Sequence, residues 1–468
     1  MIKRGSTVKK VLNLFFKNVK IFQYIKIKYR RKGRHMTGQL SLKVRNCGPL
    51  SRRTKFQILA LVPIYFIVAG LLLQPFDEIW RGIITIVREP DFLITDYFAI
   101  GGVGAAFVNA GVLTLLSIAI VYFLGMEMSG HTITSCFLMF GFSLFGKNIM
   151  NIWAIMMGIC LYSYYHKTSI TRYIYVGFYG TSLSPIITQI MQIGNLHLAS
   201  RLILSIFVGL GIGFVLPPLS THTHYAHKGY SLYNVGFSAG IIATVIVSLM
   251  KSFGISIESR LIWFEGDNEL FARLLLFLFF GMIIFAFLLS ENVGKRYLGI
   301  LKTYGLSGTD YVKSEGFAPT LLNMGINGIV ATLILVMLGG ALNGPTIGGI
   351  FTIVGFSATG KHLRNILPIM IGVILGGAIQ NWSITDPSAL LALLLSTTLA
   401  PIAGEFGVLA GIMAGFLHSA AALNVGIVYG GMNLYNNGFA GGLIATFLVP
   451  VYQSVRDRSA RAKVHDSL

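Results

Sequence analysis

The sequence predicts an all-α integral membrane protein built from two homologous halves. Three observations support this prediction: the composition is apolar, apolar stretches recur along the chain, and the chain contains an internal repeat. We expect about 10–14 transmembrane segments, because a spanning helix needs roughly 20 apolar residues. We expect one short broken or re-entrant segment in each half, and the two halves are predicted to be inverted repeats.

The composition separates this chain from soluble proteins. Of its 468 residues, 54% are hydrophobic and only 12% are charged, and the mean hydropathy is +0.71. A soluble domain typically carries about 25% charged residues. The composition therefore favours a bilayer environment.

Apolar stretches of about 17–25 residues, enough to cross a bilayer, fill most of the chain after residue 55. They lie at residues 56–75, 98–125, 149–165, 173–193, 200–217, 232–250, 271–289, 317–341, 363–380, 387–403, 406–423 and 432–452. Two further runs, 132–145 and 346–359, are too short to span comfortably, so we expect them to be broken or re-entrant helices.

The internal repeat is visible without gaps at an offset of 214 residues. Residues 96–161 and 310–375 share 23 identities in 66 positions. The motif Gly141-Phe-Ser-x-x-Gly-Lys147 returns as Gly355-Phe-Ser-x-x-Gly-Lys361, and a second motif, Leu-Tyr-Asn-x-Gly-Phe, begins at residues 232 and 434. The chain is therefore an internal duplication.

The distribution of charge predicts the orientation. Residues 1–55 hold 17 of the 37 Lys and Arg and no acidic residue, and the last residues are also basic. Positively charged ends favour the cytoplasm, so both termini are expected there and the protein is expected in the cell membrane. An odd number of passages per half then inverts the second half; an even number, which would give parallel repeats, is the alternative.

The same features divide the chain. We expect a basic cytoplasmic arm at residues 1–55, a first membrane repeat at 56–255, a linker at 256–270, a second repeat at 271–452 and a cytoplasmic tail at 453–468. Beside a hydrophobic body, the arm is expected to contact anionic lipids in the bilayer rather than nucleic acid. An oligomer is compatible with this class.

Polar residues that recur in both halves are the candidate substrate-binding residues, because a pseudo-twofold site is lined by equivalent groups. They are Asn109, Asn323, Lys147, Lys361, Asn151, Asn365, Tyr233, Asn234, Tyr435 and Asn436. Each type also has a structural alternative: hydrogen bonding between helices for the amides, snorkelling for the lysines and helix capping for the Tyr-Asn pairs.

Other polar residues carry weaker hypotheses. Glu127, Glu405 and His418 lie near apolar segments and could serve ion coupling, but the two acids are not duplicated. The three histidines at residues 222–227 could bind a metal, although no carboxylate accompanies them. No catalytic residue, metal site or cofactor is predicted, and the chain is not expected to be an enzyme.

The duplicated Gly-Phe-Ser-x-x-Gly-Lys and Leu-Tyr-Asn-x-Gly-Phe motifs resemble those of the uncharacterised bacterial membrane family called domain of unknown function 1576, over about residues 56–455. The resemblance implies a membrane location and this architecture, but no substrate. The Tyr-Asn helix starts are also weakly similar to those of urea transporters, which implies small neutral solutes.

The expected function is a membrane transporter or channel for a small polar or anionic solute, with its site at the interface of the two repeats. The alternatives are a membrane subunit that does not transport, or a membrane-embedded metal protein or enzyme.

Overall fold

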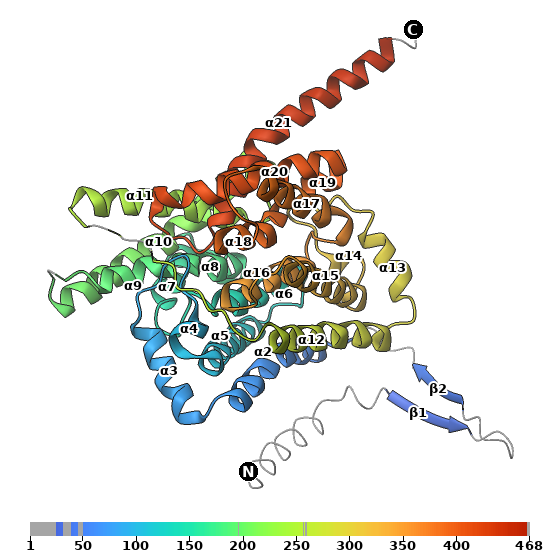
Figure 1. Cartoon of the computed structure of the whole chain (residues 1–468), viewed down its shortest axis with the longest axis horizontal. Coiled ribbons are helices and arrows are strands. Elements are labelled where there is room, and N and C mark those ends of the chain that lie inside the picture. Colours follow the sequence, from blue (N-terminus) through green and yellow to red (C-terminus); the bar gives the residue numbers. More distant parts are fainter. Residues whose placement is uncertain are drawn as a thin grey trace.

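The computed structural model describes residues 25–30, 39–44, 50–194, 196–255, 257 and 260–465. From residue 50 onward the described chain forms a helical body (Figure 1). Two strands, β1 (Ile25–Arg30) and β2 (Gln39–Val44), precede this body in sequence and form an antiparallel pair within the basic arm.

The first half contains long, short and broken helices. They are α2 (Arg52–Leu73), α3 (Phe76–Arg88), α4 (Tyr97–Gly101), α5 (Val103–Phe123), α6 (Gly130–Phe142), α7 (Trp153–Tyr165), η2 (Ile170–Arg172), α8 (Ile174–Gly180), η3 (Thr181–Leu183), α9 (Ser184–Met191), α10 (Leu198–His227) and α11 (Asn234–Ser252).

The second half repeats this order. Its helices are α12 (Asn268–Leu289), α13 (Val293–Ile300), α14 (Tyr311–Ser314), α15 (Phe317–Met337), α16 (Gly344–Phe356), α17 (Leu363–Ile379), α18 (Pro387–Leu395), η4 (Ser396–Leu399), α19 (Ala400–Phe406), α20 (Val408–Val425), η5 (Gly426–Tyr429) and α21 (Asn436–His465). From α2 to α11, each α-helix therefore has a counterpart between α12 and α21.

Nine helices in the described part of the chain are long and apolar enough to cross a membrane. They are Arg52–Leu73, Val103–Phe123, Leu198–His227, Asn234–Ser252, Asn268–Leu289, Phe317–Met337, Pro387–Phe406, Val408–Tyr429 and Asn436–Arg458. The chain is thus a multi-pass helical protein of the membrane type.

The apolar stretch at residues 173–193, which is long enough to span as one helix, is broken in the structure. It forms α8, a single 3-10 turn and α9, and the longest of these pieces has eight residues. Pro185 explains part of the break, because proline has no N–H for a hydrogen bond to the preceding turn. In the second half, Pro401 is the second residue of α19, at the equivalent place.

The two short helices α6 and α16 pack against each other at the centre of the molecule (Figure 1). The Thr134 hydroxyl donates to the Gly355 carbonyl at 2.8 Å. At the other end of the contact, a Cβ added to Gly141 would lie 2.8 Å from the Gly348 carbonyl oxygen. The early residues of one helix therefore face the late residues of the other, so the pair is antiparallel.

Both short helices begin with the same capping arrangement. Ser129 caps α6 and Asn343 caps α16, and in each case the threonine three residues later returns a hydrogen bond, which closes a capping box. Every residue of α16 is buried, and so is every residue of α6 except His131. Capping is needed here because buried N–H groups at a helix start have no water to bind.

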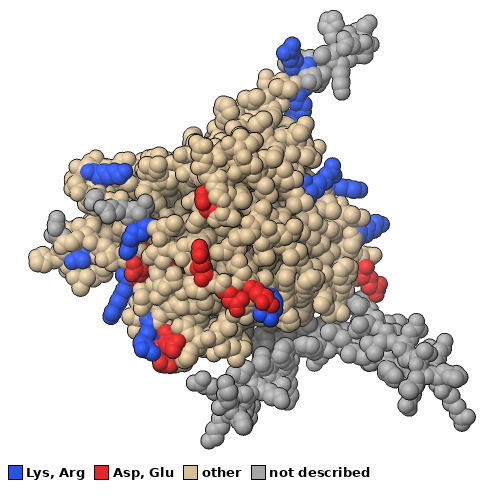
Figure 2. Space-filling model, viewed as in Figure 1, with Lys and Arg blue, Asp and Glu red and all other residues tan. Residues whose placement is uncertain are grey.

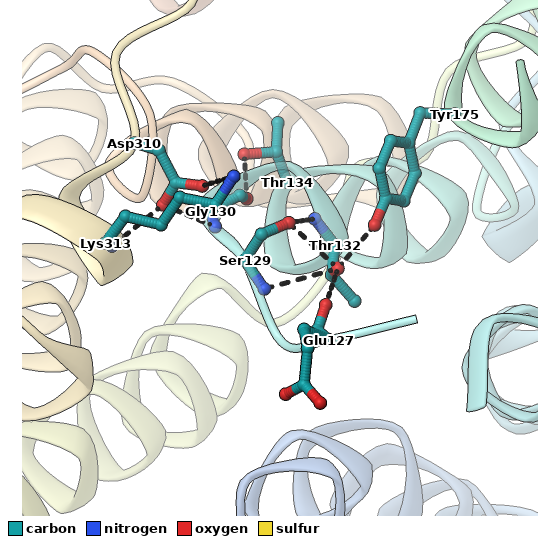
Figure 3. Close-up of polar contacts among 8 residues, drawn as sticks. All are labelled: Glu127, Ser129, Gly130, Thr132, Thr134, Tyr175, Asp310 and Lys313. Atoms are coloured by element: carbon teal, nitrogen blue, oxygen red, sulfur yellow. Dashed lines mark hydrogen bonds and ion pairs between the residues drawn. The ribbon is translucent and has the colours of Figure 1, made fainter. Parts of the chain in front are cut away.

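A duplicated aspartate from each half reaches the start of the short helix of the other half. Figure 3 shows Asp310, whose Oδ1 accepts a 2.9 Å hydrogen bond from the Gly130 N–H at the start of α6. Its counterpart Asp96 accepts from the Gly344 N–H at the start of α16. These reciprocal contacts connect the two halves.

Charged side chains are sparse on the face drawn in Figure 2. Lys and Arg lie mostly toward the left and right edges of this view, and uncharged residues cover most of the area between them. Ion pairs in the described chain are few, and Arg456 with Glu405, at 2.7 Å, is one of them. The body is therefore held by packing and hydrogen bonds more than by charge.

We expect Asp310→Ala to lower the free energy of unfolding by about 1–2 kcal/mol, because the Gly130 N–H loses its acceptor and the Lys313 N–H keeps only the backbone carbonyl of residue 310. Chemical denaturation of the purified protein in detergent measures this. Asp77→Ala is the control, since Asp77 forms only an exposed ion pair with Arg81. Equal effects of the two substitutions would contradict the role given to Asp310.

Candidate functional site

The duplicated amides Asn109 and Asn323 hold the ends of the two short helices. The Asn109 Nδ2 donates to the carbonyls of Ser143 at 2.7 Å and Lys147 at 2.9 Å. The Asn323 Nδ2 donates to the equivalent carbonyls of Ser357 and Lys361, both at 2.7 Å. Carbonyls at a helix end lack partners within the helix. These two amides supply the missing donors, which is a structural role.

A second amide pair, Asn151 and Asn365, holds the turn that follows each short helix. The Asn151 Nδ2 donates to the Gly146 carbonyl at 3.0 Å, and its Oδ1 accepts from the Asn148 N–H. Asn365 makes the same two contacts 214 residues later. Both amides therefore fix the backbone on either side of the duplicated lysine.

The third amide pair joins the last helix of each half to the helix before it. The Asn234 Nδ2 donates to the Ser220 carbonyl at 2.6 Å, and the Asn436 Nδ2 donates to the Ala422 carbonyl at 2.8 Å. Their Oδ1 atoms are hydrogen-bonded to equivalent residues, His227 in the first half and Tyr429 in the second. The nitrogen and the oxygen of both amides therefore have hydrogen-bond partners within the protein.

Two tyrosines meet where the halves join. The rings of Tyr233 and Tyr435 have centroids 5.1 Å apart, and both side chains are buried. Each also packs on the phenylalanine of the opposite short helix: Tyr435 on Phe142 and Tyr233 on Phe356, at 4.6 and 4.7 Å. The tyrosines and short helices therefore form one contact region around the pseudo-twofold axis.

The two duplicated lysines lie beside this region and are fully buried. The Lys361 Nζ donates to the Tyr233 hydroxyl oxygen and, at 2.7 Å, to Thr397. The Lys147 Nζ instead donates to the Phe178 carbonyl at 3.0 Å. Neither lysine forms an ion pair in the described part of the chain.

This difference between the lysines leaves the tyrosines unequal. Tyr233 accepts from Lys361, whereas the hydroxyl of Tyr435 is buried without any hydrogen-bond partner among the described residues. An unpaired buried hydroxyl is costly. The two halves therefore differ at the tyrosines.

A cavity of about 140 Å³ lies between the halves, at the two tyrosines. Polar and aromatic lining residues come from both halves and include His131, Tyr233, Asn234, Ser307, Thr359 and Tyr435. Three of the ten candidate substrate-binding residues, Tyr233, Asn234 and Tyr435, therefore line this cavity. Asn109, Asn323 and Asn436 lie in separate helix contacts outside it.

A larger groove of about 520 Å³ lies between α2, α12 and α15, but almost all of its lining is aliphatic or aromatic. Its tyrosine, Tyr65, already donates to the Leu274 carbonyl. The groove lacks polar groups that could orient a polar solute, so the smaller cavity is the candidate site.

The sequence analysis missed Asp91, a fully buried carboxylate between α3 and α4, outside the candidate spans. Its Oδ1 accepts from the Tyr97 hydroxyl at 2.6 Å, and its Oδ2 accepts from the Asn151 Nδ2 at 2.9 Å. Burial raises the pKa of Asp91 from 3.8 to about 8. No repeat signal marks it, because the equivalent position is Gly305.

His418, Glu405 and Glu127, the weaker candidates for ion coupling, are either paired within the protein or exposed. His418 is buried and hydrogen-bonded to the Asn437 carbonyl, and Glu405 binds Tyr230 and Arg456. Glu127 is exposed (Figure 3). No group of three metal-ligating side chains occurs within the described ranges.

Comparison with known proteins identifies one family. The model of a family described as protein of unknown function (DUF1576) matches residues 76–252 and 289–454. Searches of curated proteins and of solved structures found no match. The resemblance inferred from the duplicated motifs is confirmed, whereas the similarity to urea transporters has no support here.

We expect Asn323→Ala to lower the free energy of unfolding by about 1–3 kcal/mol, because two buried carbonyls lose their donor. Thermal and chemical unfolding in detergent measure the change. Asn424→Ala is the matched control: its amide is exposed and bonds within its own helix, so the effect should stay within about 0.5 kcal/mol. Unchanged stability of the Asn323 variant would contradict the structural role.

Proposed function

The chain belongs to a family of proteins of unknown function, DUF1576, and we propose that it is a multi-pass membrane transporter or channel for a small polar or anionic solute. The solute passes at the interface of the two repeats. The family match covers both repeats but assigns no activity, so the proposal rests on the residues of the cavity between them.

The observation that carries the proposal is the unused hydrogen-bonding capacity of Tyr435. The hydroxyl of Tyr233 is hydrogen-bonded to Lys361 and Thr397. The hydroxyl of Tyr435, in contrast, is buried without a partner in the described part of the chain. A free O–H donor that lines the cavity favours a solute with hydrogen-bond acceptors.

The lysines near the cavity support the same class of solute. Lys361 contacts Tyr233 directly, and Lys147 lies at the equivalent place in the first half. A buried lysine amine presents N–H donors, which favour an anion or a strongly polar group with acceptor atoms. The cavity volume, about 140 Å³, limits the solute to a few non-hydrogen atoms.

The contact between α6 and α16 supports inverted repeats. Helices that are equivalent by a twofold rotation and that touch in an antiparallel manner need an axis perpendicular to their length. If they run across the bilayer, that axis lies in the membrane plane, as in many transporters with inverted repeats. Each short helix has 13 residues and a length of about 20 Å, less than a hydrocarbon core of about 30 Å. We therefore retain the proposal that these helices are re-entrant or broken.

The proposed orientation places both basic termini in the cytoplasm and the body in the cell membrane, because positively charged segments are retained inside. The arm at residues 1–55 then faces the anionic lipids of the inner leaflet.

We expect Tyr435→Phe to lower solute flux about tenfold and to leave thermal stability unchanged or slightly higher. The substitution removes only a hydroxyl that has no protein partner, so packing is kept while one bond to the solute is lost, about 1–1.5 kcal/mol. Proteoliposomes with radiolabelled phosphate, lactate and urea measure the flux.

Tyr452→Phe is the control, because Tyr452 lies away from the cavity and its hydroxyl bonds to Ala410. It should leave flux within about twofold of the native rate. If the native protein transports a probe and Tyr435→Phe transports it equally fast, the tyrosines do not contact the solute. Absence of flux for all three probes would favour the alternative of a membrane subunit that does not transport.

Single cysteines at the equivalent positions Glu127 and Ala341 test the inverted arrangement, in a background without Cys47, Cys136 and Cys160. With inverted repeats, a membrane-impermeant maleimide should label the two cysteines from opposite sides of the membrane. Labelling of both from one side would instead require parallel repeats.

A further inference from the structure

A buried carboxylate that the proposed pathway does not use is joined through Asn151 to the turn before one of the duplicated lysines. Asp91 has no exposed surface, and its two oxygens accept from Tyr97 and Asn151. It forms no ion pair in the described part of the chain. A buried ionised carboxylate with only neutral partners is costly. A functional role would explain why the protein keeps this group.

The surroundings of Asp91 contain little other charge. Glu89, two residues earlier, is paired with Arg260 at 3.0 Å. From α9, Thr188 accepts the backbone N–H of Asp91 and the Gln189 amide approaches its carbonyl. From the second half, the Gly431 carbonyl accepts from Leu93 in the same segment. Tyr97 and Glu89 are therefore the titratable groups that face Asp91.

The second half shows that the fold does not need this acid. The equivalent of Asp91 is Gly305, yet Asn365 holds the Gly360 carbonyl and the His362 N–H as Asn151 holds their counterparts. A Cβ added at Gly305 would lie 2.0 Å from the Gly360 carbonyl oxygen, so backbone fills the position. The same turn thus forms with a carboxylate in one half and without it in the other.

The contacts of Asp91 favour a proton over a metal cation as its partner. The Asn151 amide and the Tyr97 hydroxyl both present hydrogens to the carboxylate, whereas a hard cation requires several oxygen ligands turned toward it. A proton needs no such shell. When it binds at Oδ1, the new O–H can donate to the Tyr97 oxygen across the same 2.6 Å contact, and the Tyr97 hydroxyl proton then has to turn away from the carboxylate.

One amide joins Asp91 to the cavity region. The Asn151 Nδ2 donates both to the Asp91 Oδ2 and to the Gly146 carbonyl, and Gly146 directly precedes Lys147. The carbonyl of Lys147 is itself held by Asn109. A change of charge at Asp91 therefore changes a hydrogen bond that fixes the turn carrying this lysine.

We propose that Asp91 is a proton-binding site that couples proton movement to passage of the solute, with Asn151 as the residue that transmits the change to the turn at Lys147. The coupling rests on the transport function proposed above, whereas proton binding does not. The raised pKa of Asp91 supports this inference, because burial brings its titration into the range of cellular pH.

Proton binding is tested first, without any solute. Infrared difference spectra of the purified full-length protein, recorded between about pH 6 and pH 9, should contain a protonated-carboxyl band that is lost as the pH rises through about 8. Burial also raises the pKa of Asp96, to about 7, so the band should contain a second component that is lost at lower pH. Asp91→Asn should lose the component that titrates near pH 8 and keep that of Asp96, and Glu405→Gln, which removes a carboxylate paired with Arg456, should keep both. A native protein without the component near pH 8, or an Asp91 variant in which that component persists, overturns the inference.

Coupling is tested next in proteoliposomes with the same three probes: phosphate, lactate and urea. In the native protein, an inward proton gradient should raise accumulation of the transported probe about tenfold, and Asp91→Asn should abolish this rise while exchange without a gradient continues within about threefold. Asparagine keeps the size of the side chain and an acceptor for Tyr97. Thermal unfolding of the variant, compared with the native protein, shows whether the fold is kept.

The outcomes distinguish the two proposals. If the Asp91 variant still accumulates solute on a proton gradient, the coupling role is wrong and transport stands. If the native protein moves none of the probes but the carboxyl band titrates as expected, transport of these solutes is wrong and the proton site stands.

Discussion

The structure depends on one constraint: every polar group that a broken helix exposes inside an apolar body must find a partner within the protein. The antiparallel contact of α6 and α16 places two helix starts and two helix ends at the centre of the molecule. Asp96 and Asp310 satisfy N–H groups at the starts, and Asn109 and Asn323 satisfy carbonyls at the ends. The aspartates join the halves, because each of them binds the short helix of the opposite repeat.

The same constraint separates structural residues from candidate functional residues. Asn151 and Asn365 make the same contacts in the two halves, and each holds a backbone carbonyl of the turn after the short helix. Such a pair is explained by its structural role. The exceptions are places where symmetry fails. Tyr435 lacks the hydrogen bond that Tyr233 has, and Asp91 occupies a position that is glycine in the second half. Unpaired or unduplicated polar groups therefore carry the functional proposals.

The sequence predicted the architecture better than the site. The gapless repeat and the length of residues 132–145 and 346–359 were enough to predict duplication and two short helices, because these depend on local pattern. The partners of Asn109 could not be predicted, since its acceptors lie 34 and 38 residues away and are chosen by packing. The position of the break within residues 173–193 could not be predicted either, because apolar content does not record where a helix loses its hydrogen bonds.

Selecting residues that recur in both halves excluded Asp91 from the candidates. Duplication preserves groups that hold the common fold, so the criterion selected amides that brace turns and passed over Asp91. What the sequence shows of Asp91 is an acid in a connecting segment. Its burial, and its link through Asn151 to the turn at Lys147, arise only when α9 and the second half close over that segment.

The most direct measurement is an experimental density map of the protein in lipid, with and without a probe that it transports. The account predicts added density in the cavity, within hydrogen-bonding distance of the Tyr435 hydroxyl and close to Tyr233. Bound solute at a different place, with the two tyrosines still in contact and their cavity unchanged, would contradict it.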